Sequence, residues 1–189
     1  MTPFDRRELL ARGGTVALAG TVLGLRPAGA RAGTPSDNDL AYARLLVVAE
    51  LLAIDFYERA LRSRRSPGAA NLRRSLRDER RHRDAVAAVL VAAGQTPPGR
   101  DDVDFIYPKG AFASRGSITE LGARLESIFL GAYLGAVAAL DADDLKLGAA
   151  RAASSEAQHL SAFTRRVGPA FPRALPIDRA SDALNQFTA

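Results

Sequence analysis

The chain contains only two histidines, and each of them follows a glutamate by one helical turn. The two motifs are Glu79-Arg80-Arg81-His82 and Glu156-Ala157-Gln158-His159. Side chains at positions i and i+3 of a helix lie on one face, about 5–6 Å apart, so the carboxylate and the imidazole of each motif can bind one metal ion. The chain has no cysteine, which excludes thiolate metal sites, iron–sulfur clusters and a cysteine nucleophile. Any metal site must therefore use oxygen and imidazole ligands.

Two further glutamates, Glu50 and Glu126, extend this pattern. The spacing from Glu50 to Glu79 is nearly the same as the spacing from Glu126 to Glu156, so the two halves of the pattern are approximate copies. In each half, a helix-breaking turn lies close to the midpoint between the lone glutamate and the paired glutamate. Antiparallel folding at both turns would bring all four carboxylates to one level.

The apolar residues around these motifs recur with the period of an α-helix. They predict four long helices, near residues 36–62, 69–93, 117–140 and 145–168, and no strand pattern of comparable length competes with them. Breaks separate the helices at Ser66-Pro67-Gly68, at Gly94, near Asp141-Ala142-Asp143 and at Gly168-Pro169. A capping box of Ser117 and Glu120 marks the expected start of the third helix. The sequence therefore predicts an all-α fold.

The lengths of the connections predict how these helices are arranged. Short breaks after the first and third helices make each pair an antiparallel hairpin, whereas the long linker at 95–116 must carry the chain back along the bundle. Extended, a linker of this length reaches about 70 Å, and a helix of about 25 residues is only about 38 Å long. We therefore expect two antiparallel hairpins joined by one long crossover.

All four glutamates and both histidines fall on the apolar stripes of the predicted helices. A buried carboxylate without a partner has a desolvation cost of several kcal/mol, so a compensating charge is expected. A single glutamate on such a stripe more often lies at its edge and reaches solvent, but the joint pattern favours a metal site. Tyr57 and Tyr133 each follow a lone glutamate by two helical turns. We interpret them as core aromatics whose hydroxyls bond ligand carboxylates, in preference to redox relays.

The order Glu, Glu-x-x-His, Glu, Glu-x-x-His on four helices resembles the ferritin-like di-metal carboxylate superfamily. It is most similar to the exported bacterial ferritin-like domain group, in which Phe-Tyr follows the first glutamate and Tyr-Leu-Gly follows the third. The corresponding residues here are Phe56-Tyr57 and Tyr133-Leu134-Gly135. The resemblance covers residues 38–166 and implies a ferritin-like four-helix bundle within residues 33–168.

The resemblance also implies roles for the six residues. Glu50 and Glu126 would be terminal ligands, Glu79 and Glu156 would bridge two metal ions, and His82 and His159 would each complete one ion. The two ions would be iron or manganese, which oxygen and imidazole donors do not distinguish. Tyr57 and Tyr133 would assist any catalysis indirectly, through contacts with the metal ligands.

Two kinds of function fit this interpretation. A di-metal enzyme would react with dioxygen or peroxide, as in ferroxidase, oxidase or manganese-catalase chemistry. A non-catalytic stress or surface protein, as supposed for desiccation-related relatives, would use the same bundle for metal binding or protein contacts. The expected tail at 169–189 contains three prolines and at most a short turn near 181–185. The absence of a cage-forming fifth helix argues against a ferritin shell and leaves a smaller homo-oligomer open.

Residues 1–32 have the features of an export signal. Arg6 and Arg7 precede an uncharged stretch from Gly13 to Leu25, and a small-residue cleavage pattern follows at 30–32. This uncharged stretch is too short to span a bilayer, which takes about 20 apolar residues. The paired arginines resemble the twin-arginine signal. We therefore expect twin-arginine export machinery as a partner, and a processed protein without a membrane span in the periplasm, at the cell envelope or outside the cell.

The net charge of +5 suggests acidic partners, but much of it lies in the expected signal. Removal of residues 1–32 leaves 21 basic and 19 acidic residues, a net charge of +2. The arginine run between residues 73 and 83 is interrupted by Asp78 and Glu79 and followed by Asp84. It is typical of a solvated helix face more than of a phosphate-binding face. The nearly balanced charge of the processed protein and its expected export together predict that it has no nucleic-acid partner.

Overall fold

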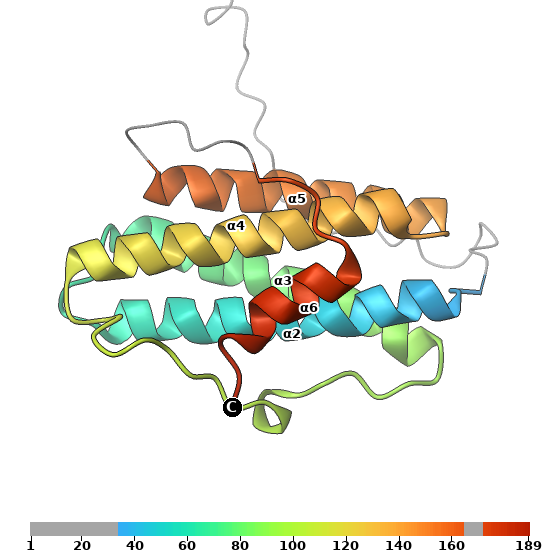
Figure 1. Cartoon of the computed structure of the whole chain (residues 1–189), viewed down its shortest axis with the longest axis horizontal. Helices are drawn as coiled ribbons and strands as arrows, with labels where there is room; N and C mark the ends of the chain where they lie inside the picture. The colour runs from blue at the N-terminus through green and yellow to red at the C-terminus, as the bar shows by residue number, and fades with distance from the viewer. Residues whose placement is uncertain (1–33, 165–171) are drawn as a thin grey trace, which may run out of the picture.

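The computed structural model describes residues 34–164 and 172–189, and four long helices make up most of this part (Figure 1). They are α2 (Asp37–Arg62), α3 (Ala69–Ala92), α4 (Arg115–Ala139) and α5 (Asp143–Phe163), followed by the short α6 (Ile177–Asn185). Within the described ranges there is no strand, and an isolated bridge pairs Phe105 with Thr188. The prediction of an all-α fold is confirmed. The expected export signal at 1–32 lies outside the described residues.

The four long helices form two hairpins. α2 packs mainly on α3, and α4 packs mainly on α5. The connections within the hairpins are short, at residues 63–68 and 140–142, so the partners run antiparallel. The crossover at 93–114 contains one 3-10 turn, η1 (Arg100–Asp102), and runs along the outside of the bundle (Figure 1). This is the predicted topology of two antiparallel hairpins with one long crossover.

Two predicted helix ends are wrong. The third helix was expected to start at a capping box of Ser117 and Glu120, but α4 starts at Arg115 with Ser114 as its N-cap, and the Ser114 hydroxyl accepts from the Ser117 N–H. Both serines can cap a helix, and the earlier one adds nearly a turn of helix. The fourth helix was expected to reach Gly168, but α5 ends at Phe163 with Thr164 as its C-cap.

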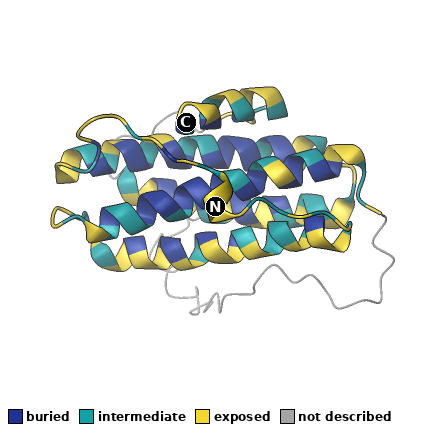
Figure 2. Ribbon diagram, turned by 90° about the horizontal axis from the view of Figure 1, so that it is seen from below, coloured by how far each residue is buried: buried dark blue, intermediate teal, exposed yellow. Residues whose placement is uncertain are grey.

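The buried residues of the helices follow the apolar stripes that the sequence predicts. The inner faces of the four long helices are buried and their outer faces are exposed (Figure 2). α4 is apolar and long enough to cross a membrane, but 61% of its most apolar window is buried inside the molecule. Its composition is therefore that of a core helix packed among other helices, which is apolar nearly all round.

The crossover is held against α2 by one buried acid. Asp55, which is 4% exposed, accepts hydrogen bonds from Arg59 of the same helix and from Arg100 and Tyr107 of the crossover. The two arginine contacts are 2.7 Å long and the tyrosine contact is 2.9 Å long. Because both Asp55 oxygens are satisfied, the buried charge stabilises the attachment of the crossover.

The C-terminal residues form a helix where at most a short turn near 181–185 was expected. α6 packs on α4 and α2 (Figure 1) and buries Ala180 and Leu184. Ahead of it, the Leu175 N–H donates to the Gly131 carbonyl at 2.8 Å. The prolines of this segment are compatible with a helix, because Pro176 is the N-cap, where no intrahelical N–H bond is needed. The described C-terminal residues thus pack on the bundle.

Candidate metal centre

The six residues predicted to bind metal come from the middle of the four long helices. Glu50 lies on α2, Glu79 and His82 on α3, Glu126 on α4, and Glu156 and His159 on α5. Glu79, Glu126 and Glu156 have an exposed fraction of 0%, and the two histidines are also buried. The structure therefore brings together every residue that the sequence pattern selected, and none of the six faces outward.

The cluster divides into two overlapping groups of potential metal ligands. Glu50, Glu79, His82 and Glu156 form one group, and Glu79, Glu126, Glu156 and His159 form the other. The ligand atoms within each group lie within 4.8 Å of one another. Glu79 and Glu156 belong to both groups, so these two residues hold the positions that a bridging role requires.

The two shared glutamates direct one oxygen toward each histidine. Glu156 places Oε1 2.9 Å from His82 Nδ1 and Oε2 3.4 Å from His159 Nδ1. Glu79 does the reverse, with Oε1 2.8 Å from His159 Nδ1 and Oε2 3.3 Å from His82 Nδ1. The outer glutamates are more distant, with Glu50 3.8 Å from His82 and Glu126 3.8 Å from His159. Both imidazoles therefore turn Nδ1 toward the centre of the cluster.

The two tyrosines connect the hairpins. The Tyr57 hydroxyl on α2 donates to Glu126 on α4, and the Tyr133 hydroxyl on α4 donates to Glu50 on α2. Each tyrosine thus bonds the outer glutamate of the other hairpin, which agrees with the prediction that these hydroxyls bond ligand carboxylates. Each bond occupies one carboxylate oxygen and leaves the second, Oε2 in both Glu50 and Glu126, without a partner among the described residues.

Unpartnered buried atoms are concentrated at this cluster. In the described residues, 11 buried side-chain nitrogen or oxygen atoms have no hydrogen-bond partner, and eight of them belong to the six cluster residues. They include both oxygens of Glu79 and of Glu156 and Nδ1 of both histidines. Buried polar atoms normally have partners because their desolvation is costly. The short contacts of the two Nδ1 atoms, 2.8–3.4 Å long, are with the oxygens of Glu79 and Glu156 inside the cluster. Eight such atoms around one point fit a group of bound cations.

The burial of so many carboxylates changes their proton affinities. Burial raises the pKa of Glu50 and that of Glu126 well above their ordinary values, and the nearby charge of Glu79 acts in the same direction. Burial alone would lower the pKa of His82, but its contacts with Glu156 and Glu79 outweigh this effect and raise it to about 11. The cluster therefore retains protons when no other cation compensates its carboxylates.

One residue of the site was missed by the sequence analysis. Asp78 places Oδ2 3.7 Å from Nε2 of His159, the ring nitrogen that faces away from the centre. The interaction with His159 lowers the pKa of Asp78, although burial acts in the opposite direction. A carboxylate at this nitrogen orients an imidazole ligand. The position of Asp78 next to Glu79 is a sequence signal for a place at the site, although Asp78 also interrupts the arginine run.

The arginine run lies on the exposed face of α3. Arg80 bonds Glu58 at 2.7 Å and Arg81 bonds Asp78 at 3.1 Å, and both arginine side chains are about half exposed. These pairs agree with the interpretation of this face as solvated.

Comparisons with known proteins agree with this fold. A family model described as a ferritin-like domain matches residues 38–169. The crystal structure of a conserved hypothetical protein from Mycobacterium tuberculosis superimposes with a TM-score of 0.60 and 22% sequence identity, over 71% of this chain and 97% of that one. At this identity the likeness shows the fold alone. No curated protein matches the sequence.

Proposed function

Because the chain belongs to the ferritin-like domain family, we propose that its six-residue cluster is a di-metal centre in an exported protein that reacts with dioxygen or peroxide. The observation that carries this proposal is the sharing of Glu79 and Glu156 between two groups of ligands. Each of these residues directs one oxygen toward each histidine, as two bridging carboxylates would.

The remaining residues divide evenly between the two ions. Glu50 and His82 would complete one ion, and Glu126 and His159 would complete the other. Four carboxylates carry four negative charges, which two divalent cations balance, so the desolvation cost of the buried acids is offset. Oxygen and imidazole donors suit iron and manganese. The unpartnered oxygens and Nδ1 atoms of the cluster support this fit.

Other features of the chain position the candidate ligands and exclude water from them. Two iron or manganese ions held by carboxylates and one imidazole each supply redox chemistry toward dioxygen or peroxide. Tyr57 and Tyr133 hold the outer carboxylates in place through their hydroxyls. The carboxylate of Asp78, 3.7 Å from Nε2 of His159, would favour the orientation of this ring with Nδ1 toward the centre. Burial of all six ligands excludes bulk water from the reacting atoms.

The first test measures metal content. The protein is purified after expression with iron or manganese, and bound metal is counted by mass spectrometry. We expect two ions per chain, and none in the double variant Glu79→Ala/Glu156→Ala, which removes both shared carboxylates. The matched control is Glu120→Ala, a solvent-exposed glutamate on α4, which should keep both ions. Two ions in the double variant would refute the assignment of the centre.

The second test decides whether the centre turns over. Consumption of dioxygen and of hydrogen peroxide by the metal-loaded protein is followed with electrodes, and His82→Ala and His159→Ala are compared with the unchanged protein. Loss of one imidazole unbalances one ion, and we expect the rate to fall at least about tenfold. Metal-loaded protein that consumes neither oxidant would support the alternative function, a non-catalytic metal-binding or stress-related protein.

The third test concerns export. Replacement of Arg6 and Arg7 by lysine should leave the precursor in the cytoplasm, whereas the unchanged chain should be recovered outside it with an N-terminus near Gly33. The twin-arginine route carries folded proteins, and metal binding is coupled to folding. This route would let the cytoplasm load the ions before export. Export of the lysine variant at the unchanged level would contradict a twin-arginine signal.

A further inference from the structure

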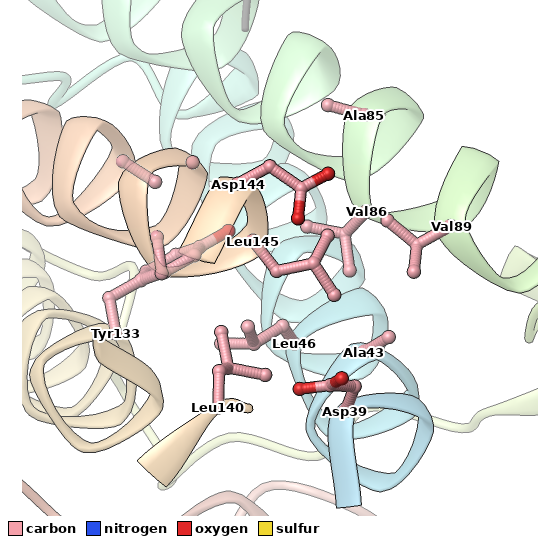
Figure 3. Close-up of a pocket in the computed structure, with 13 residues that line it drawn as sticks. Asp39, Ala43, Leu46, Ala85, Val86, Val89, Tyr133, Leu140, Asp144 and Leu145 are labelled. Atoms are coloured by element: carbon pink, nitrogen blue, oxygen red, sulfur yellow. The ribbon is translucent and has the colours of Figure 1, made fainter. Parts of the chain in front are cut away.

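One end of the bundle contains a cavity that lies beside the candidate metal centre and is separated from it by Tyr133, a lining residue that bonds Glu50. It has an internal volume of about 50 Å³ and is lined by all four long helices. Figure 3 shows Val86 and Val89 of α3 on one side of Leu145 of α5 and Leu46 of α2, with Tyr133 of α4 on the side away from α3. Asp144, at the start of α5, is exposed, whereas Tyr133 is 1% exposed. The cavity therefore extends from the surface to the interior.

The buried end of this cavity lies next to one half of the centre. Its lining residue Tyr133 donates to Glu50 and has its ring 6.2 Å from that of His82. Leu46 lies one helical turn from Glu50, and Val86 lies one turn from His82. A molecule in the cavity would thus lie next to the Glu50 and His82 side of the centre.

The lining favours an uncharged, apolar occupant. Most of the lining residues are alanine, valine, leucine and glycine. The Tyr133 hydroxyl already donates to Glu50, and the two Asp39 oxygens accept from the N–H groups of Ser36 and Asp141. A volume of about 50 Å³ is several times the roughly 10–15 Å³ that one water needs, but a water also needs two to four polar partners, and apolar cavities bind small apolar molecules instead.

In the other half of the centre, a described side chain, Phe163, occupies the equivalent place. The internal repeat that pairs Glu50 with Glu126 also pairs Leu46 with Gly122, and Val86 corresponds to Phe163, one turn after each histidine. The ring of Phe163 fills the space above Gly122, where an added Cβ would lie only 2.6 Å from it. Phe163 also packs 6.3 Å from the ring of Tyr57. Two exchanges thus distinguish the two ends, phenylalanine in place of valine and glycine in place of leucine, and the phenylalanine ring lies over the glycine.

We propose that this cavity binds dioxygen and delivers it to the Glu50 and His82 side of the centre. This inference rests on the proposed function and chooses between its two oxidants. Hydrogen peroxide has two hydroxyl groups that would lose their hydrogen bonds to water here, because the buried polar groups of the lining, Tyr133 and Asp39, are engaged and the Asp144 carboxylate lies at the exposed mouth. Dioxygen has no such cost. The filled position of Phe163 directs access to one ion of the pair.

The test uses xenon as an apolar probe of the same size class as dioxygen. Crystals of the full chain, with and without metal, are pressurised with xenon, and we expect one xenon atom between Tyr133 and Val86. The variant Val86→Phe copies Phe163 and should exclude xenon. Ala85→Leu, at the partly exposed edge of the cavity, is a second filling variant should the first fail to fold. The matched control is Val91→Phe, on the same helix and 60% exposed, which should leave xenon binding unchanged.

A complementary variant and a rate measurement complete the test. Phe163→Val should create a second xenon site beside Tyr57. With two metal ions retained, Val86→Phe should slow dioxygen consumption at least about tenfold and leave peroxide consumption unchanged. No xenon in the unchanged protein, or an unchanged dioxygen rate in a filling variant that excludes xenon, overturns the inference. Xenon binding does not depend on the six candidate metal ligands. If the protein binds xenon but takes up no metal, the result therefore contradicts the proposed function and not the cavity.

Discussion

Among single residues, the two tyrosines determine where the outer carboxylates lie. Tyr57 and Tyr133 bond Glu126 and Glu50 across the interface between the hairpins, and both side chains are almost completely buried. Burial raises the pKa of each tyrosine well above its ordinary value, and the nearby glutamates act in the same direction. Both tyrosines therefore stay neutral donors over the physiological range.

We expect Tyr57→Phe and Tyr133→Phe each to destabilise the metal-free protein. Each variant leaves a buried carboxylate oxygen without its donor, which costs about 1–3 kcal/mol. Urea denaturation followed by circular dichroism measures the loss, and the two values should be similar because the two bonds are related by the internal repeat. Unchanged stability in both variants would mean that these hydroxyls do not hold the carboxylates.

A second residue, Asp39, links stability to pH. Burial alone would raise the pKa of Asp39, but hydrogen bonds from the N–H groups of Asp141, Ser36 and Ala142 outweigh it and lower the pKa below 3.8. The unfolded chain therefore binds a proton at higher pH than the folded chain. The stability that Asp39 contributes is complete above its ordinary pKa and is lost as the pH falls through the lowered value.

We therefore expect the difference in stability between the unchanged protein and Asp39→Asn to depend on pH. It should be constant between about pH 6 and pH 5 and should shrink below about pH 4, where the unfolded chain binds a proton at this aspartate before the folded chain does. Denaturation midpoints across this range measure it. Asp101→Asn, at an exposed aspartate, is the control. A difference that grows on acidification would contradict the lowered pKa.

Among the elements, the crossover depends on its attachment to α2. Asp55→Ala removes three hydrogen bonds at once, from Arg59, Arg100 and Tyr107. Because the two arginines are 40% and 46% exposed, they can be solvated after the change, and we expect a loss of about 2–4 kcal/mol. Asp104→Ala, exposed in the same crossover, should be near neutral. Equal stability of the two variants would show that Asp55 does not anchor the crossover.

The C-terminal segment packs closely on α4 at a position where the helix has no side chain. A Cβ at Gly135 would lie 1.8 Å from the Leu175 carbonyl oxygen, whereas a Cβ at Gly116 would meet only the Ser114 hydroxyl, at 3.7 Å. We expect Gly135→Ala to displace the segment and cost about 1–3 kcal/mol. Gly116→Ala, on the same helix, should be neutral or stabilising. Hydrogen exchange of residues 177–189 checks this, and protection equal to that of the unchanged protein would contradict it.

At the scale of the whole molecule, metal would join the two hairpins. One hairpin supplies Glu50, Glu79 and His82, and the other supplies Glu126, Glu156 and His159. Four carboxylates at one level repel one another unless protons or cations compensate them. Each group of potential ligands contains residues from both hairpins. Loading the centre should therefore stabilise the packing of one hairpin on the other.

We expect metal to raise the melting temperature of the unchanged protein. Free metal at about 100 times its dissociation constant adds about 2.7 kcal/mol for one site. The variant Glu79→Ala/Glu156→Ala should show no metal-dependent increase, yet its metal-free form should be at least as stable as that of the unchanged protein, because buried charge is removed. Calorimetry with and without metal measures both effects. A melting temperature that metal does not change, in protein shown to bind two ions, would contradict this account.

The sequence by itself determined the presence of the four long helices and the residues of the candidate centre. Helical periodicity records which face of each helix is buried, so ligand-type residues on an apolar stripe are visible without a structure. The repeated spacing from Glu50 to Glu79 and from Glu126 to Glu156 made their common level predictable. The all-α fold followed from the same signal, and the topology followed from the connection lengths, because short connections permit only antiparallel neighbours.

Only the tertiary structure decided the features that depend on contacts between distant residues. The start of α4 at Arg115 was a choice between two serines that cap equally well. The helix at 177–185 gains its stability from packing on α4 and α2, which local sequence does not report. The cavity beside Tyr133 and the filled position of Phe163 depend on how side chains from all four long helices meet. Periodicity shows that a side chain is buried but not what it packs against, because packing is decided in three dimensions.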